Sequence, residues 1–510
     1  MRNIRKKTEN GVMLQAFEWE LPADAGHWKR LAGMSRTLAF QGVTAVWLPP
    51  AAKGNAGIHD TGYGVYDLWD LGEFDQKGSV STKYGTRAEF QEAVRQIRRY
   101  GMQALCDLVL NHRMGGEEEE TVRAVPVDTE NRLHTLGAPE EIRAYTHFTF
   151  PGRRGKYSEF VWNASCFTGV DYSSTDPDHH LFLFEGKQWA EDVDREKGNY
   201  DYLMGCDVDV NAPWVREELL NWGRWFLKTS GCDGFRLDAV KHISAGFYRD
   251  FLSRLRQETG RELYSVGEYW NSDVHVLHNY LEQTGYTMNL FDVPLHFHFL
   301  QASSTGGGYD MRHILDDTLV STHAQNAVTF VDNHDTQPGQ SLESWVQGWF
   351  KASAYGLILL RKEGYPCVFW GDLKGIPSSG IGKVPELPIL MKVRQKLAYG
   401  YERDYLDDPN VIGFVREGDD RVPGSGLVFL CTNGAGGQKE MEVGKKFAGR
   451  TFVCLIGDQK RVKIDERGKA VFSVKDGRMS LYVPVQTPRE MLGHGLRTAG
   501  RFLSVWLRRI

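Results

Sequence analysis

The sequence has no regular spacing of cysteines and no long hydrophobic run. Its seven cysteines form no C-x-x-C pair, and several lie in apolar, strand-like stretches, so a disulfide framework is not expected. They occupy positions 106, 166, 206, 232, 367, 431 and 454. No window approaches the roughly 18 uninterrupted apolar residues of a membrane-spanning helix, so none is predicted.

A strong excess of charge of either sign is also missing. The net charge is −5 over 510 residues, which gives no reason to expect a nucleic-acid partner. The first residues, MRNIRKKTENGVMLQAF, are basic but lack the apolar stretch and cleavage site of a secretory signal. A cytoplasmic protein is therefore expected. The length predicts two or three domains, each with its own core.

Short apolar runs recur along the first 400 residues, and most are continuous, as in strands that are buried on both faces. The runs cover residues 12–19, 43–50, 102–112, 234–240, 262–270, 289–297, 326–335 and 365–373. Helical patterns lie between them, over residues 89–101, 212–231, 247–260 and 341–364. Alternating strands and helices predict a (β/α)8 TIM barrel, with a doubly wound open sheet as the alternative.

The alternation is interrupted once, and it ends near residue 400. Residues 113–210 are polar, irregular and acidic, which predicts a lobe inserted after the third strand of a barrel formed by residues 1–112 and 211–400. Residues 401–487 contain short strands joined by Gly/Asp-rich turns, which indicates a C-terminal antiparallel β-sandwich domain.

The last segment, residues 488–510, has the pattern of a basic amphipathic helix. Such a helix packs most often on its own domain or on a partner subunit. If this segment does not pack on its own domain, it could take part in self-association or contact a membrane surface.

Polar residues gather where four of the predicted strands end, the position at which TIM barrels carry their active sites. The third strand ends in DLVLNH, the fourth contains GFRLDAVKH, the fifth ends in GEYW and the seventh in FVDNHD. The residues concerned are Asp107, Asn111, His112, Arg236, Asp238, Lys241, His242, Glu268, Asp332, Asn333, His334 and Asp335.

Each of these residues has an ordinary structural explanation when taken alone, and an isolated R-x-D is most often a structural ion pair. Together they would bring several carboxylates to one rim, which is electrostatically costly without a function. The sequence shows no nucleophilic serine or cysteine arrangement and no phosphate-binding loop. Paired carboxylates of this kind are typical of glycoside hydrolysis.

The neighbouring residues suggest which carboxylate is the nucleophile and which is the general acid. Arg236 lies two residues from Asp238 and favours its ionised form, so Asp238 is the better nucleophile. Glu268 has no neighbouring cation in the sequence and is flanked by Tyr269 and Trp270, which suits a general acid with a raised pKa. Asp335 is expected to stabilise the oxocarbenium-like transition state or to orient sugar hydroxyls, with His112 and His334 donating hydrogen bonds to the same sugar.

These motifs resemble, in order and spacing, the four signature regions of the α-amylase family, glycoside hydrolase family 13. The resemblance extends to GYGVYDLWDLGEFDQKGSVSTKYGT and GNYDYLMGCDVDV, covers about residues 10–485, and is nearest to the bacterial liquefying-type subgroup with its cytoplasmic members. It implies a retaining α-amylase that hydrolyses α-1,4-linked glucans in starch, glycogen or maltodextrins.

The resemblance also implies a role for each matching residue. Asp238 is then the nucleophile, Glu268 the acid/base and Asp335 the stabiliser. Around the bond that is cut it implies substrate contacts from Arg236, His112, His334 and Tyr63, with Lys241 and His242 on the leaving-group side.

Three aspartates at the end of the inserted lobe suggest a Ca²⁺ site. Asp201, Asp207 and Asp209 are closely spaced but do not fit an EF-hand loop, and Asn111 could add a further oxygen. The family resemblance implies one calcium held by Asn111, Asp201, Asp207 and the carbonyl of His242. A solvated acidic loop is the alternative.

A second metal cluster, containing calcium and sodium, is found in secreted liquefying amylases of this family. Two of its aspartate positions correspond here to Thr168 and Ala190, so a single calcium is expected.

Two alternatives to an endo-acting α-amylase remain open from the sequence. One keeps the fold but changes the reaction, to a transglycosylase or to an exo-acting or α-1,6-glucosidase. The other is a non-catalytic relative that binds carbohydrate, against which the three carboxylates argue. The expected partner in all cases is an α-glucan polysaccharide or oligosaccharide.

Overall fold

The computed structural model describes residues 10–176, 178 and 180–487. The chain divides into two compact units. The first unit comprises Leu14–Phe40 and Thr44–Phe291, and the second comprises Met1–Met13, Gln41–Val43 and Asp292–Ile510. The predicted helix at 488–510 lies outside the described residues.

Eight strands form a closed barrel in which each strand lies beside the next one along the chain, which confirms the predicted barrel. The barrel pairings within each unit are parallel, for example between β5, β12 and β13. The strands are β1 (Met13–Gln15), β2 (Ala45–Leu48), β5 (Gln103–Leu108), β12 (Gly234–Leu237), β13 (Tyr264–Gly267), β14 (Asn289–Phe291), β15 (Ala327–Phe330) and β16 (Tyr365–Phe369).

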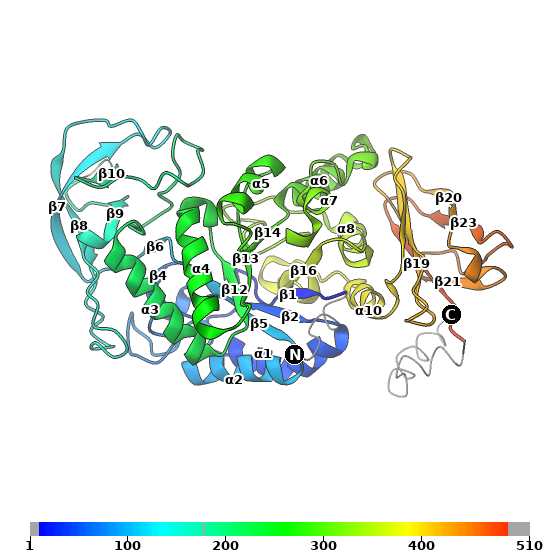
Figure 1. The fold of residues 1–510 in the computed structure, drawn as a ribbon, viewed down its shortest axis with the longest axis horizontal. Coiled ribbons are helices and arrows are strands. Elements are labelled where there is room, and N and C mark those ends of the chain that lie inside the picture. Colours follow the sequence, from blue (N-terminus) through cyan, green and yellow to red (C-terminus); the bar gives the residue numbers. More distant parts are fainter. Residues whose placement is uncertain (1–9, 177, 179, 488–510) are drawn as a thin grey trace. The chain divides into compact units, whose positions relative to one another are not determined.

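Five helices belong to the first unit, and three of them match the predicted helical patterns closely (Figure 1). Their ends carry ordinary signals, such as the capping box of Thr86 and Glu89 and the left-handed glycines at 231 and 260. The five are α1 (His27–Gln41), α2 (Arg87–Arg99), α3 (Pro213–Ser230), α4 (Ala245–Thr259) and α5 (Val274–Gln283). The patterns named above do not include α1 and α5.

The second unit differs from the prediction where two apolar runs change from strand to helix. Asp292 accepts a hydrogen bond from the backbone NH of Leu295 and Pro294 lies in the first turn, so 293–297 open a helix. Residues 370–373, predicted as strand, likewise belong to a short helix. The helices are α6 (Val293–Thr305), α7 (Leu319–Thr322), α8 (Gly348–Leu360), α9 (Trp370–Lys374) and α10 (Leu387–Leu397).

The segment after β5, predicted to be irregular, contains a six-stranded sheet with the order β6-β11-β9-β10-β7-β8. Its small core comprises Val127, Leu181, Trp189 and Tyr202. The strands are β6 (His112–Arg113), β7 (Glu118–Val127), β8 (Glu140–His147), β9 (Phe167–Val170), β10 (Leu181–Phe184) and β11 (Cys206–Val208). A separate two-stranded sheet joins β3 (Lys53–Gly54) to β4 (Val65–Asp67).

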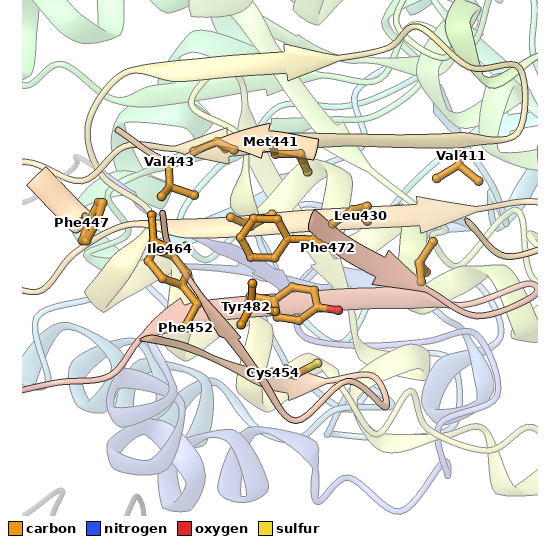
Figure 2. Packing of buried hydrophobic residues seen from close by; sticks show 14 residues of the cluster. Val411, Leu430, Met441, Val443, Phe447, Phe452, Cys454, Ile464, Phe472 and Tyr482 are labelled. Atoms are coloured by element: carbon orange, nitrogen blue, oxygen red, sulfur yellow. The ribbon is translucent and has the colours of Figure 1, made fainter. Parts of the chain in front are cut away.

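The predicted C-terminal β region consists of a six-stranded antiparallel sheet, β17-β18-β19-β24-β21-β22, and a separate two-stranded antiparallel sheet, β20-β23. Figure 2 shows its core, where Leu430, Phe452, Phe472 and Tyr482 pack together. The strands are β17 (Glu402–Tyr405), β18 (Val411–Arg416), β19 (Leu427–Thr432), β20 (Gly437–Glu442), β21 (Thr451–Ile456), β22 (Arg461–Lys463), β23 (Lys469–Val474) and β24 (Met479–Pro484).

Helix α8 packs directly on β19 through Gly356. A Cβ atom at this position would lie 2.1 Å from Cε2 of the fully buried Phe429. We therefore expect Gly356→Ala to lower the free energy of unfolding by about 1–3 kcal/mol, despite the better helix propensity of alanine. Chemical denaturation followed by circular dichroism measures the change.

Gly348 on the same helix serves as the control, because nothing lies within 4 Å of a Cβ atom built there. Gly348→Ala is expected to be neutral or to stabilise by up to about 1 kcal/mol. Equal effects of the two substitutions would contradict the close packing of α8 on β19.

None of the seven cysteines forms a disulfide bond, and all of them are buried. Within the described part of the chain, no helix combines the length and the apolar character that crossing a membrane requires.

Candidate active site

Arg236 on β12 joins three carboxyl groups of the first unit. Its Nη1 donates to Oδ1 of Asp107 at 3.0 Å and to Oδ1 of Asp238 at 2.5 Å. Its Nη2 donates to Oε2 of Glu268 at 2.7 Å. The arginine is fully buried, and the three acids come from β5, from the end of β12 and from the end of β13. The R-x-D pair is therefore part of a larger ionic cluster.

The register of the barrel strands brings these side chains together. Arg236 lies opposite Asp107 on β5 and opposite Val266 on β13. At the strand ends, the backbone NH of Asp238 donates to Leu108 and that of Glu268 donates to Leu237, both at 3.0 Å. These backbone bonds fix the two acids at the carboxyl ends of neighbouring parallel strands.

Asp107 was noted in the sequence as a strand-end acid but was given no role. Its Oδ2 accepts hydrogen bonds from Trp47 Nε1 and from the Tyr63 hydroxyl, each at 2.9 Å. Burial raises the pKa of Asp107 to about 6, against the lowering effect of the Arg236 charge. Asp107 thus fixes the arginine and Tyr63 in one cluster, a function that depends on strand pairing and that its local sequence does not reveal.

Glu268 has the raised pKa that was predicted, and burial is its main cause, as expected. Burial raises its pKa to about 7, although Arg236 acts in the opposite direction, and Asp238 raises it further. The cation beside Glu268 comes from the neighbouring strand and is therefore not adjacent to it in the sequence. The Tyr269 hydroxyl donates to Asp194 at 2.6 Å.

A strained turn separates Asp238 from the loop that follows it. Ala239 adopts φ 46° and ψ 43°, a left-handed conformation that costs a non-glycine residue about 1 kcal/mol or more. In this conformation its backbone NH donates to Oε2 of Glu268 at 3.1 Å. The same carboxylate oxygen thus accepts two hydrogen bonds, one from Ala239 and one from Arg236.

His112 and Tyr63 lie beside this cluster, and their contact with a sugar stays a prediction. His112 Nε2 lies 2.7 Å from the carbonyl oxygen of Tyr63, and burial lowers the pKa of the imidazole. The Tyr63 ring is nearly parallel to that of Trp19, with centroids 5.8 Å apart.

Lys241 and His242 connect the barrel to the inserted lobe. Lys241 Nζ donates to Glu196 at 2.9 Å and to the carbonyl of Trp270 at 3.2 Å. His242 Nδ1 lies 2.7 Å from the carbonyl oxygen of Tyr200. Burial lowers the pKa of His242 to about 3, so its ring is neutral. Their contact with the leaving group stays a prediction.

The predicted calcium ligands lie close together, and their oxygens are poorly satisfied by protein donors. Among the described residues, neither carboxylate oxygen of Asp207 has a hydrogen-bond partner, and the same holds for Oδ1 of Asn111. The amide nitrogen of Asn111 donates to the carbonyl of His242 at 2.7 Å. Buried oxygens without donors are what a hard cation requires, so the residues fit Ca²⁺.

The charges of this group support the same fit. Burial raises the pKa of Asp207, and the neighbouring Asp201 raises it further. Burial raises the pKa of Asp201 to about 7, although its Oδ2 accepts the backbone NH of Ala190 at 2.8 Å. Asp209 differs, because it has an ion-pair partner of its own: Lys187 Nζ lies 2.6 Å from its Oδ2. A further group, Asp176, Asp178 and His180, lies at the lobe surface.

His334 and Asp335 follow β15, in the second unit. His334 is fully buried, and its Nε2 lies 3.2 Å from Oδ2 of Asp335. The backbone NH of Asp335 donates to Oδ1 of Asn333 at 2.8 Å. The approach of Asp335 to Asp238 and Glu268 stays a prediction.

Comparison with known proteins identifies the family. Residues 23–383 match the family described as "Alpha amylase, catalytic domain". The chain belongs to the α-amylase family. It is 48% identical to an "Alpha-amylase" of Bacillus licheniformis, over 93% of this chain and 93% of that protein.

Two further members of the α-amylase family extend the comparison. A "Cytoplasmic alpha-amylase" of Escherichia coli (strain K12) is 40% identical over 93% of this chain and 99% of that protein. The solved structure of an α-amylase from Geobacillus thermoleovorans, complexed with acarbose, is 16% identical with a TM-score of 0.61. The match covers 94% of this chain and 98% of the Geobacillus chain. At this low identity it supports the assignment of the fold and nothing further.

Proposed function

We propose that the chain is a retaining, endo-acting α-amylase that hydrolyses α-1,4-glucosidic bonds in starch, glycogen or maltodextrins. The observation that carries the proposal is the sharing of one buried guanidinium by Asp238 and Glu268. A shared arginine keeps two carboxyl groups near each other, which favours the short spacing of retaining enzymes, about 5–5.5 Å, over the longer spacing of inverting ones. The sequence identity to α-amylases supplies the substrate class.

In the first step, a carboxylate oxygen of Asp238 attacks the anomeric carbon, and the bond to the leaving glycosyl oxygen breaks. Oδ1 of Asp238 is occupied by Arg236, so Oδ2 is the attacking atom. Glu268 donates its proton to the departing oxygen. Because Oε2 of Glu268 already accepts two hydrogen bonds, the proton resides on Oε1.

In the second step, the Glu268 carboxylate takes a proton from a water molecule, which attacks the same carbon and releases Asp238. Two inversions leave the α configuration unchanged. Asp335 stabilises the positive charge that develops on the sugar, and His334 donates a hydrogen bond to one of its hydroxyls. His112 contacts the same sugar as an acceptor through Nδ1, because its ring is neutral and the proton on Nε2 is donated to the Tyr63 carbonyl. Tyr63 stacks on that sugar, and Lys241 and His242 contact the leaving chain.

A single calcium ion completes the proposal, held by Asn111, Asp201, Asp207 and the carbonyl oxygen of His242. When bound, the ion supplies positive charge that neutralises the buried aspartates and ties the lobe to the barrel. Thr168 and Ala190 offer no carboxylate for a second cluster. A cytoplasmic location is proposed as well, supported by the identity to the E. coli protein of that name.

The pKa of Glu268 sets the alkaline side of the activity profile. Because a general acid must carry its proton, kcat/KM for maltooligosaccharides is expected to fall tenfold per pH unit above about pH 7, the value to which burial raises this pKa. Initial rates between pH 5 and 9 measure it.

α-Maltosyl fluoride provides the control for this profile, because fluoride leaves without a proton. Its kcat/KM is expected to stay flat across the same alkaline range. A parallel fall for both substrates would mean that Glu268 is not the acid.

The proposed function is tested by incubating the protein with amylose and maltoheptaose and resolving the products by size and anomer. Internal cleavage to several maltooligosaccharides, each first formed as the α anomer, is expected. Glucose alone would indicate an exo-acting enzyme, products longer than the substrate a transglycosylase, and binding without products a non-catalytic relative.

A further inference from the structure

The loop between β15 and α8 carries His334 and Asp335, and its shape depends on Asp332. The Thr336 hydroxyl donates to Oδ1 of Asp332 at 2.8 Å and accepts the backbone NH of Asn333 at 3.0 Å. Oδ1 of Asn333 in turn accepts the backbone NH groups of Asp335 and Thr336, at 2.8 and 2.9 Å. A continuous set of hydrogen bonds therefore runs from Asp332 to the backbone of Asp335.

Asp332 is itself held by a lysine from the following helix. Nζ of Lys351, on α8, lies 2.8 Å from Oδ2 of Asp332 and also contacts Asp372 on α9. The other oxygen of Asp372 accepts the Tyr355 hydroxyl at 2.6 Å. Lys351 and Asp332 are each only 2% exposed. Two carboxyl groups, one ammonium group and a phenol thus form a buried network beneath the loop.

Burying such a network costs free energy, because its charged groups lose their hydration. A buried ion pair can often be replaced by apolar residues with no loss of stability. Burial raises the pKa of Asp332 to about 7, against the lowering effect of Lys351. Stability alone is therefore a poor reason for these charges. A better reason is that the hydrogen bonds starting at Asp332 extend to the backbone of Asp335.

We propose that Lys351 and Asp332 are positioning residues for the reaction, which hold the β15–α8 loop so that Asp335 and His334 meet the sugar. Neither residue touches substrate in this proposal. The inference rests on the proposed function, because it assumes that Asp335 stabilises the transition state. Lys351 acts through Asp332, and Asp332 acts through Thr336 and Asn333.

Asp332→Asn tests the proposal. The amide keeps the size of the side chain but turns an NH₂ group toward Lys351 or toward Thr336, so the loop must shift. A displacement of about 1 Å near the chemistry costs roughly 100-fold in rate. We expect kcat for maltoheptaose hydrolysis to fall about 100-fold, with KM changed less than about threefold.

Thr336→Val is the second variant, because it removes the hydroxyl link while leaving every charge in place. It is expected to lower kcat in the same way, and it keeps the proposal testable if Asp332→Asn fails to fold. Glu402→Gln is the matched control. Glu402 belongs to β17, is 7% exposed at its side chain and is ion-paired with Arg361 at 2.6 Å.

The control is expected to lower the melting temperature as much as the test variants do, with kcat unchanged. If folded Asp332→Asn and Thr336→Val retain the wild-type kcat, the positioning role is wrong. A wild-type protein that cleaves no α-glucan would instead contradict the proposed function, so the two failures are distinct.

Discussion

We expect Asp238→Asn to abolish hydrolysis of maltoheptaose, with kcat reduced by about 10⁴-fold or more. The amide of asparagine cannot form the ester-like bond to the anomeric carbon, so the first chemical step has no nucleophile. The fold should survive, because Arg236 keeps Asp107 and Glu268 as its other partners. Initial rates by reducing-sugar release, with circular dichroism to establish folding, measure the change.

Asp233→Asn is the matched control, since Asp233 directly precedes the amino end of β12 whereas Asp238 directly follows its carboxyl end. It loses ion pairs with Arg98 and Arg261, both at 3.3 Å, and should keep the wild-type kcat. Asp238→Gly with added azide separates the nucleophile from a structural role, because azide can attack in place of the carboxylate and yield a β-glycosyl azide. Loss of activity in Asp233→Asn, or wild-type rates in Asp238→Asn, would contradict the assignment.

The barrel was predictable from the sequence because its strands are buried on both faces and read as continuous apolar runs. The lobe sheet was not, for the opposite reason. Most residues of β7 and β8 are exposed or half-buried, and their sequences, EEETVRAVPV and EEIRAYTH, are rich in charge. When one face of a strand is exposed to solvent and the segment lacks a strong alternating pattern, its sequence resembles that of an irregular loop.

The acids of the candidate site were predictable from their place at strand ends, but their partners were not. Arg236 and Asp238 are two residues apart and can be paired by inspection. The contacts of Arg236 with Asp107 and Glu268 depend on the registers of β5, β12 and β13, which link residues 129 and 32 positions apart. The local sequence of a strand does not determine how it is paired in register with strands far away in the chain. Burial was therefore expected correctly as the cause of the raised pKa of Glu268, whereas the opposing effect of Arg236 was not predicted.

Calcium is expected to stabilise the protein, and Asp207→Asn is expected to remove that effect. At calcium concentrations 100 to 1,000 times the dissociation constant, binding adds about 3–4 kcal/mol to the stability of the folded state. The wild-type protein should therefore melt several degrees higher in calcium than in EDTA. The variant should melt at the same temperature in both, because it loses the carboxylate whose two oxygens have no hydrogen-bond partner among the described residues.

A second expectation concerns the melting temperature of Asp207→Asn in the absence of calcium. Asp201 and Asp207 are both buried, and each raises the electrostatic cost of the other. In EDTA, Asp207→Asn relieves that repulsion and should melt no lower than the wild-type protein. Asp209→Asn is the control: Asp209 is paired with Lys187 and is not one of the proposed ligands, so the calcium-dependent rise should persist. A variant of Asp207 that still gains stability from calcium would place the ion elsewhere, and one calcium per chain by titration is the expected stoichiometry.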